Sequence, residues 1–323
     1  MPFKTVGLMF SGNGDLPVSA VSEISAAAEQ KGFSGLWFGE TTIRDAGVLS
    51  CLAISATKKV EVGTSIVNVY TRSPGQLAML AATLNELSDG RFTLGLGAST
   101  PTIVSGWHGV PYEKPLLKVE ETVKLLRLYF SGERFDYKGY FNSPSNARLR
   151  VKGTPRIALA ALNEKMIGLA SRLADRVILN LYPSSMIPEV LRIRKEANPS
   201  SHARLSVMLY AYVLGESDKG LQASKELIAF YASSEAYSRL FARAGYAEEA
   251  KRAYDAWRLK DRELVRKSIT DEMVQTLMVY GDINTLRERV MAYHDAGVDD
   301  VLISPCPTGN YVENIRHIVE HYF

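Results

Sequence analysis

The stretch from residue 60 to residue 97 constrains the fold more than any other part of the chain. Val60–Ile66 is a short run rich in β-branched residues, which is typical of a buried strand, and Phe92–Gly97 is a second such run after a turn. Between them Pro74 opens a segment whose apolar residues recur every three or four positions, as in a helix that packs one face on a sheet. A strand, a helix and a second strand in this order predict a parallel βα unit.

The same alternation of short apolar runs and helical patterns recurs along the rest of the chain. The other strand candidates are Val6–Phe10, Gly35–Gly39, Arg156–Ala161, Arg176–Leu181, Leu205–Val213 and Asp300–Ser304. The other helix candidates are Val18–Lys31, Gly47–Thr57, Leu116–Phe130, Asn163–Ala174, Ile187–Ala197, Thr285–Ala296 and Tyr311–Tyr322. Eight strands that alternate with helices predict an α/β fold, a (β/α)8 TIM barrel built as one domain over residues 1–323. A doubly wound dinucleotide-binding sheet would need G-x-G-x-x-G at its first turn, and the partial match at Gly95 and Gly97 lacks the third glycine.

Two segments interrupt the alternation and are interpreted as insertions. Residues 133–154 carry aromatic residues around Gly139, which indicates a small antiparallel hairpin laid over one end of the barrel. Residues 218–267 are helical throughout and much longer than one barrel helix requires. We interpret them as a barrel helix plus a helical insertion that covers the site or forms a subunit contact.

Composition narrows the class of protein and its partners. Of the 323 residues, 46% are hydrophobic and 23% are charged, the usual balance for a soluble protein with a large core, and the net charge is only +3 without a Lys/Arg block. A small-molecule substrate is therefore favoured over nucleic acid or a membrane as the partner. Among small molecules, an anionic one is the natural partner of a slightly basic chain. Cys51 and Cys306 lack the spacing of metal ligands, so we expect no metal site and two unpaired thiols. The first residues do not resemble a signal peptide, so we expect a cytoplasmic location. A homodimer or higher homo-oligomer is expected.

Candidate site residues follow the predicted strands, where ligands bind in a TIM barrel. Polar and apolar residues mix over 65–72 just past the third strand, and Arg72 there is either an ion-pair residue or a ligand contact. Residues 161–166 begin a helix after the fifth strand, so their backbone N–H groups and Lys165 suit an anion. His108, in the loop after the fourth strand, is either an idle surface residue or a catalytic contact.

The residues at these positions resemble a known superfamily. The similarity rests on Gly63-Thr64-Ser65, Asn68, Tyr70 to Pro74, Ala82-Thr83-Leu84, Leu87-Ser88, Gly90-Arg91 and Leu94 to Gly97, and continues at Gly35-Leu36-Trp37, Arg44-Asp45, Ala160 to Met166, Ala174-Asp175, Asn180, Gly281, Ala296-Gly297-Val298 and Ser304-Pro305. In this order and spacing they resemble the luciferase-like flavin and deazaflavin oxidoreductases, and within them most nearly the F420-dependent methylenetetrahydromethanopterin reductases.

The resemblance implies a coenzyme site and a reaction. It implies an F420-dependent oxidoreductase that transfers a hydride between the deazaflavin and a small organic substrate, with a reduced-FMN monooxygenase and a non-catalytic flavin-binding or structural barrel as alternatives. It also implies a cis peptide bond between Ser65 and Ile66, behind the coenzyme ring. The coenzyme-binding residues implied are Gly39, Ser65, Ile66, Asn68, Gly97, Ala98, Ala161, Leu162, Asn163, Lys165 and Asn180.

The chain departs from the resembled reductases near the expected hydride-transfer face. It has Met9 where they carry Glu, Gly39-Glu40 where they carry Asp-His, Thr100 where they carry an acidic residue, and Asn163-Glu164 where the family usually has Gly-Pro. Their named reaction is therefore not carried over. Glu40 and His108 remain as catalytic candidates, Glu40 as a general acid or, alternatively, as a helix-terminal carboxylate or a partner of Arg44.

Overall fold

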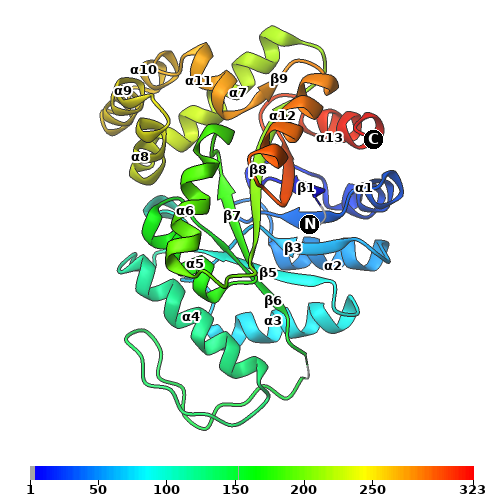
Figure 1. The fold of residues 1–323 in the computed structure, drawn as a ribbon, viewed down its shortest axis with the longest axis vertical. Coiled ribbons are helices and arrows are strands. Elements are labelled where there is room, and N and C mark those ends of the chain that lie inside the picture. Colours follow the sequence, from blue (N-terminus) through cyan, green and yellow to red (C-terminus); the bar gives the residue numbers. More distant parts are fainter. Residues whose placement is uncertain (1–3, 152) are drawn as a thin grey trace.

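A closed barrel of eight parallel strands forms the centre of the computed structural model, which describes residues 4–151 and 153–323 (Figure 1). The barrel strands are β1 (Thr5–Phe10), β2 (Gly35–Phe38), β3 (Glu61–Thr64), β5 (Phe92–Gly97), β6 (Arg156–Ala160), β7 (Arg176–Asn180), β8 (Arg204–Tyr212) and β10 (Asp300–Pro305). Each pairs in parallel with the next, and β10 closes the barrel by pairing with both β8 and β1. The predicted TIM barrel is confirmed.

Two short strands were not predicted as separate elements. β4 (Val67–Asn68) pairs with β5, and β9 (Val279–Tyr280) pairs with β8. The predicted strand Val60–Ile66 is therefore divided, because the chain bends between β3 and β4 at Ser65 and Ile66.

Helices follow the barrel strands and begin at residues suited to that role. They are α1 (Val18–Lys31), α2 (Ala46–Ala56), α3 (Pro74–Leu87), α4 (Pro115–Phe130), α5 (Glu164–Leu173), α6 (Ile187–Ala197), α12 (Ile283–Asp295) and α13 (Tyr311–His321). Ser73 and Gln76 form a capping box at the start of α3, and Gly32 ends α1 at φ 102°, a left-handed conformation that suits glycine. No helix of the described residues is long and apolar enough to cross a membrane.

The first insertion packs along α4 and not over the end of the barrel, which corrects the prediction. Phe135 and Ala147 exchange two backbone hydrogen bonds of 3.0 and 2.9 Å, so the segment is an antiparallel hairpin with little regular strand. Its tip is held by the buried carboxylate of Glu121 on α4, which accepts hydrogen bonds from the backbone N–H groups of residues 140–142. A buried carboxylate needs such donors, and the hairpin supplies them. Residue 152 of this segment and residues 1–3 lie outside the described residues.

The second insertion is a group of helices beside the barrel. It contains α7 (Ser217–Ala232), α8 (Glu235–Arg243), α9 (Ala247–Arg258) and α10 (Arg262–Lys267), and α11 (Asp271–Leu277) follows before β9. Figure 1 shows α8, α9 and α10 grouped next to the barrel and away from α3 and α4. A short π-helix (Thr102–Trp107) after β5 and a short 3-10 helix (Ser184–Met186) before α6 were also not predicted.

An ion cluster fills the barrel at the amino ends of the strands. Asp300 at the start of β10 accepts hydrogen bonds from Arg176 of β7, Arg204 of β8 and Thr5 of β1. Arg176 also contacts Glu61 of β3 at 2.7 Å. Burial alone would raise the pKa of Asp300, but Arg204, Arg176 and Thr5 outweigh it and hold that pKa below the ordinary value of 3.8. The cluster thus joins strands from opposite sides of the barrel.

We expect Asp300→Asn to lower the free energy of unfolding by about 3–5 kcal/mol, because it leaves buried arginine charge without its carboxylate. The stabilising effect of the native carboxylate is present above the ordinary aspartate pKa and is lost as the pH falls through the lower pKa of the folded state. Denaturant unfolding at neutral pH measures the difference.

Asp295→Asn is the matched control. Asp295 pairs with Lys4 at 3.4 Å, and its side chain is 77% exposed, so its replacement should change stability by less than about 1 kcal/mol. Equal unfolding free energies for the two variants would contradict the role given to Asp300.

Candidate active site

A cavity of about 300 Å³ opens at the carboxyl ends of the barrel strands, opposite the ion cluster. Every barrel strand or its following loop contributes to the lining, through Met9, Gly39, Ser65, Gly97, Ala160, Asn180, Tyr210 and their neighbours, except β10. The helical insertion contributes Phe230, Tyr231, Ser234, Tyr237 and Trp257. The insertion therefore covers the site, which was one of the two roles considered for it.

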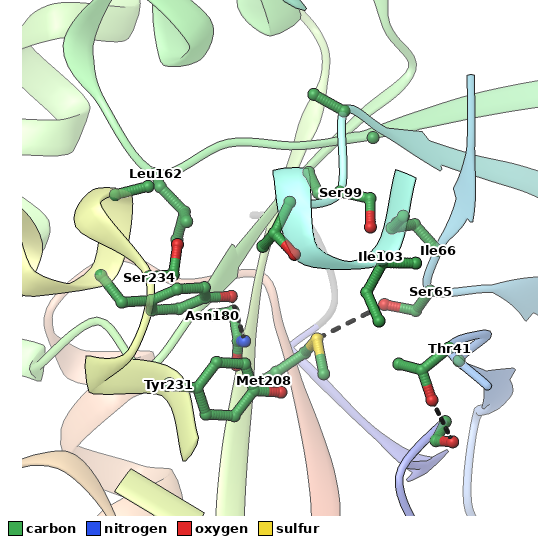
Figure 2. A pocket seen from close by; sticks show the side chains of 18 of the residues that line it. Thr41, Ser65, Ile66, Ser99, Ile103, Leu162, Asn180, Met208, Tyr231 and Ser234 are labelled. Atoms are coloured by element: carbon green, nitrogen blue, oxygen red, sulfur yellow. Dashed lines mark hydrogen bonds between the residues drawn. The ribbon is translucent and has the colours of Figure 1, made fainter. Parts of the chain in front are cut away.

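One wall of the cavity is formed where β3 turns into β4. The peptide bond between Ser65 and Ile66 is cis, which confirms the prediction. Ile66 faces Gly97 at the end of β5, where an added Cβ would lie 3.1 Å from Cγ1 of Ile66 and 3.3 Å from Cβ of Ala160. Figure 2 shows Ser65, Ile66 and Ile103 on this side, with the Ser65 hydroxyl donating to the sulfur of Met208 at 3.4 Å. Glycine at position 97 keeps this wall open.

Most of the predicted site residues meet at the cavity. They are Gly39, Glu40, Ser65, Ile66, Gly97, Ala98, Ala161, Leu162, Asn163 and Asn180. Met9 and Thr100, where the chain departs from the resembled reductases, line it as well. Asn163 also caps α5 by accepting a hydrogen bond of 3.0 Å from the Met166 backbone N–H, so one of the expected anion donors is occupied.

Three predicted site residues do not line the cavity. Asn68 is buried, and its Oδ1 accepts hydrogen bonds of 3.0 Å from the backbone N–H groups of Tyr70 and Thr71, so its side chain shapes the turn before α3. Lys165 lies in a surface groove between α5 and α6. His108 is exposed at the end of the π-helix. A strand-end position in the sequence does not fix the direction of the side chain, which explains these differences.

Glu40 lines the cavity but forms an ion pair with Arg72. Arg72 donates to both carboxylate oxygens at 2.6 and 2.9 Å, and the backbone N–H of Ala46 donates to Glu40 at 3.0 Å. The pKa of Arg72 is raised, chiefly by its hydrogen bond to Glu40. Arg44, the partner considered from sequence, instead contacts Asp15 at 2.6 Å. This geometry favours a structural ion pair that holds the loop after β2 against the start of α3.

The sequence did not identify the tyrosines that line the cavity. Tyr210 comes from β8, and Tyr231 and Tyr237 come from α7 and α8. Tyr210 and Tyr231 are hydrogen-bonded through their hydroxyls at 2.6 Å, and Asn180 donates to the Tyr237 hydroxyl at 2.7 Å. The only signal was the abundance of tyrosine in the insertion, since helical periodicity does not show which face meets a cavity. Among the described residues, no group of three or more His, Cys, Asp or Glu could hold a metal ion.

We expect Glu40→Gln to lower the free energy of unfolding by about 1.5–3 kcal/mol, because it removes a charge-assisted pair whose carboxylate side chain is only 10% exposed. Glu86→Gln, at an exposed position on α3, is the control and should change stability by about 0.5 kcal/mol at most. Chemical denaturation of both variants tests this. Unchanged stability together with a roughly hundredfold loss of turnover would instead support proton donation by Glu40.

Comparison with known proteins agrees with the geometry. A family model described as luciferase-like monooxygenase matches residues 5–300. A 5,10-methylenetetrahydromethanopterin reductase of Archaeoglobus fulgidus is 30% identical, with 85% of this chain and 86% of the relative covered. A putative coenzyme F420-dependent oxidoreductase of Mycobacterium tuberculosis is 26% identical, with 97% of each chain covered.

A solved structure has the same fold. The coenzyme F420-dependent tetrahydromethanopterin reductase of Methanopyrus kandleri superposes with a TM-score of 0.83 at 20% identity, over 98% of each chain. The extent of the family match and of the similarity to the Archaeoglobus relative leads to one conclusion: the chain belongs to the luciferase-like monooxygenase family.

Proposed function

We propose that the protein is an F420-dependent oxidoreductase that transfers a hydride between the deazaflavin and a small organic substrate. Membership of the luciferase-like family makes it an oxidoreductase, and the name of its Mycobacterium relative favours F420 among the coenzymes. The observation that carries the proposal is the wall of Ile66 against Gly97, an apolar surface without a Cβ at position 97, at the end of a barrel where ligands bind.

The residues of the cavity fit a tricyclic ring with a polar tail. Its volume of about 300 Å³ is within the range of ligand pockets, and apolar side chains from Ile66, Ile103 and Met208 face it. The tail would be held by the residues at the start of α5, Ala161 to Asn163, which line the same cavity. When bound, F420 supplies a carbon that accepts or donates a hydride.

The chain's own residues determine what surrounds the reacting atoms. Met9, Phe230 and Trp257 contribute apolar surface, which limits water in the cavity. Glu40 is held by Arg72, and Met9 and Thr100 replace acidic residues of the resembled reductases, so a pterin substrate is not proposed. Reduced FMN, the coenzyme expected of a monooxygenase, is the alternative that the same wall could accommodate.

Titration of the purified protein with F420 and, separately, with FMN tests the coenzyme. We expect F420 to bind with a saturable change in its fluorescence and FMN to bind at least tenfold more weakly, because the Mycobacterium relative that supports the proposal is F420-dependent by name. Binding of FMN alone would replace the proposal by the monooxygenase alternative, and binding of neither would favour a non-catalytic barrel.

Gly97→Ala tests the proposed wall. The added methyl group would lie 3.1–3.3 Å from Ile66 and Ala160 and force one of them toward the cavity, so F420 affinity should fall about tenfold. Gly106→Ala is the control, because no heavy atom lies within 4 Å of the added Cβ there. Fluorescence titration gives both dissociation constants, and equal values for the two variants would place the coenzyme elsewhere.

A further inference from the structure

The side of the cavity opposite Ile66 is polar and is built mainly by the helical insertion. Figure 2 shows Tyr231, Asn180 and Ser234 facing Ser65, Ile66 and Ile103 across the cavity, with Met208 between the two sides. Tyr210 and Tyr237 line the same cavity. We call Tyr210, Tyr231, Tyr237 and Asn180 the tyrosine cluster.

The hydrogen bonds of the tyrosine cluster leave one buried polar atom without a partner. The hydroxyls of Tyr210 and Tyr231 lie 2.6 Å apart, Tyr210 is also hydrogen-bonded to Ser11, and Tyr231 is also hydrogen-bonded to the side chain of Asn180. Asn180 donates its Nδ2 to the Tyr237 hydroxyl at 2.7 Å, while its buried Oδ1 has no hydrogen-bond partner among the described residues. Unpartnered buried polar atoms are unfavourable in a protein interior, which indicates that a ligand completes this network.

The tyrosine cluster is neutral. Burial raises the pKa of Tyr231 and of Tyr237, and burial together with the neighbouring Tyr231 raises that of Tyr210, so all three keep their protons at physiological pH. They can therefore donate and accept hydrogen bonds but do not carry charge.

The rest of the lining does not supply a charge that a substrate could use. No Lys, Arg or His is among the residues that line the cavity in the described part of the chain. Glu40 is the one carboxylate there, and Arg72 binds both of its oxygens. A phosphate, carboxylate or ammonium group placed against the tyrosine cluster would lose its hydration without gaining a counter-charge, which is strongly unfavourable.

We propose that the tyrosine cluster is the substrate subsite, and that it selects a small uncharged molecule with one carbonyl or hydroxyl oxygen on an apolar frame. The substrate oxygen accepts a hydrogen bond from Tyr231 or, as a hydroxyl, donates one to Oδ1 of Asn180. Asn180 is a positioning residue for the Tyr237 hydroxyl. This assignment rests on the proposed function, since it leaves the Ile66 side of the cavity to the coenzyme.

Binding of neutral and anionic probes to the F420-loaded protein tests the subsite. The probes are cyclohexanone, cyclohexanol and cyclohexanecarboxylate, and the change in F420 fluorescence gives each dissociation constant. We expect the two neutral probes to bind and the carboxylate to bind at least tenfold more weakly, because only the carboxylate would require a counter-charge. Failure of both neutral probes to bind, or binding of the carboxylate as tightly as the ketone, would overturn the proposal.

Tyr231→Phe removes one hydroxyl and retains the ring. We expect it to weaken cyclohexanone binding by about 5- to 20-fold and to leave the affinity for F420 within about twofold of the wild type. Tyr246→Phe is the matched control, because the Tyr246 hydroxyl contacts Thr276 at 2.6 Å outside the cavity lining. Thermal unfolding checks that both variants are folded.

The two affinities separate the possible failures. Absence of F420 binding to the wild type would contradict the proposed function, whatever the variants do. Normal F420 binding with unchanged cyclohexanone binding in Tyr231→Phe would overturn the subsite alone. An equal loss of F420 affinity and cyclohexanone affinity in that variant would assign Tyr231 to the coenzyme site and would also overturn the substrate subsite.

Discussion

The ion cluster around Asp300 is the interaction on which the arrangement of the barrel depends. Arg176 from β7, Arg204 from β8 and Thr5 from β1 all donate to one carboxylate on β10, the strand that pairs with β8 and β1, and Arg176 also reaches Glu61 of β3 across the barrel. The inside of a barrel is shielded from water, so charges placed there must be paired with one another. The ion cluster stabilises the closed barrel at the amino ends of the strands. The loops at the carboxyl ends therefore need not do so and remain available for binding. The division between a stabilising end and a binding end is characteristic of the TIM barrel.

Periodicity in the sequence was sufficient to predict the barrel, because buried parallel strands and amphipathic helices each have a local signature. The start of α3 at Pro74 and the end of α1 before Gly32 were predictable for the same reason, since caps depend on a few neighbouring residues. The path of the hairpin tip, residues 140–142, was not predictable, because it depends on Glu121 of α4, a carboxylate that no local pattern connects to the hairpin. Non-local hydrogen bonds of this kind leave no periodic trace.

The site shows the same limit at the level of single side chains. Positions such as Gly97 and Ile66 were identified because they follow strands and resemble a family pattern, and both line the cavity. Lys165 and His108 were chosen because they lie in segments that follow strands, yet neither lines the cavity, since such a position does not fix where a side chain lies. Tyr237 lies 57 positions from Asn180 in the chain, and only the folded insertion brings the two within 2.7 Å. Sequence reasoning therefore located the wall of Ile66 and Gly97, where we propose that the coenzyme binds, better than the opposite side of the cavity.

The differences from the resembled reductases and the composition of the insertion both indicate a cavity with few charges. Met9 and Thr100 stand where those enzymes carry acidic residues, and both line the cavity, so the barrel side has fewer charges than the resemblance implies. The remaining carboxylate, Glu40, is bound by Arg72 and does not present a free charge. An ionic substrate would need an oppositely charged residue on the insertion. Tyr231 and the other residues that the described part of the insertion places in the cavity are all uncharged. Neither side of the cavity thus presents a free charge, as expected if the substrate is an uncharged molecule.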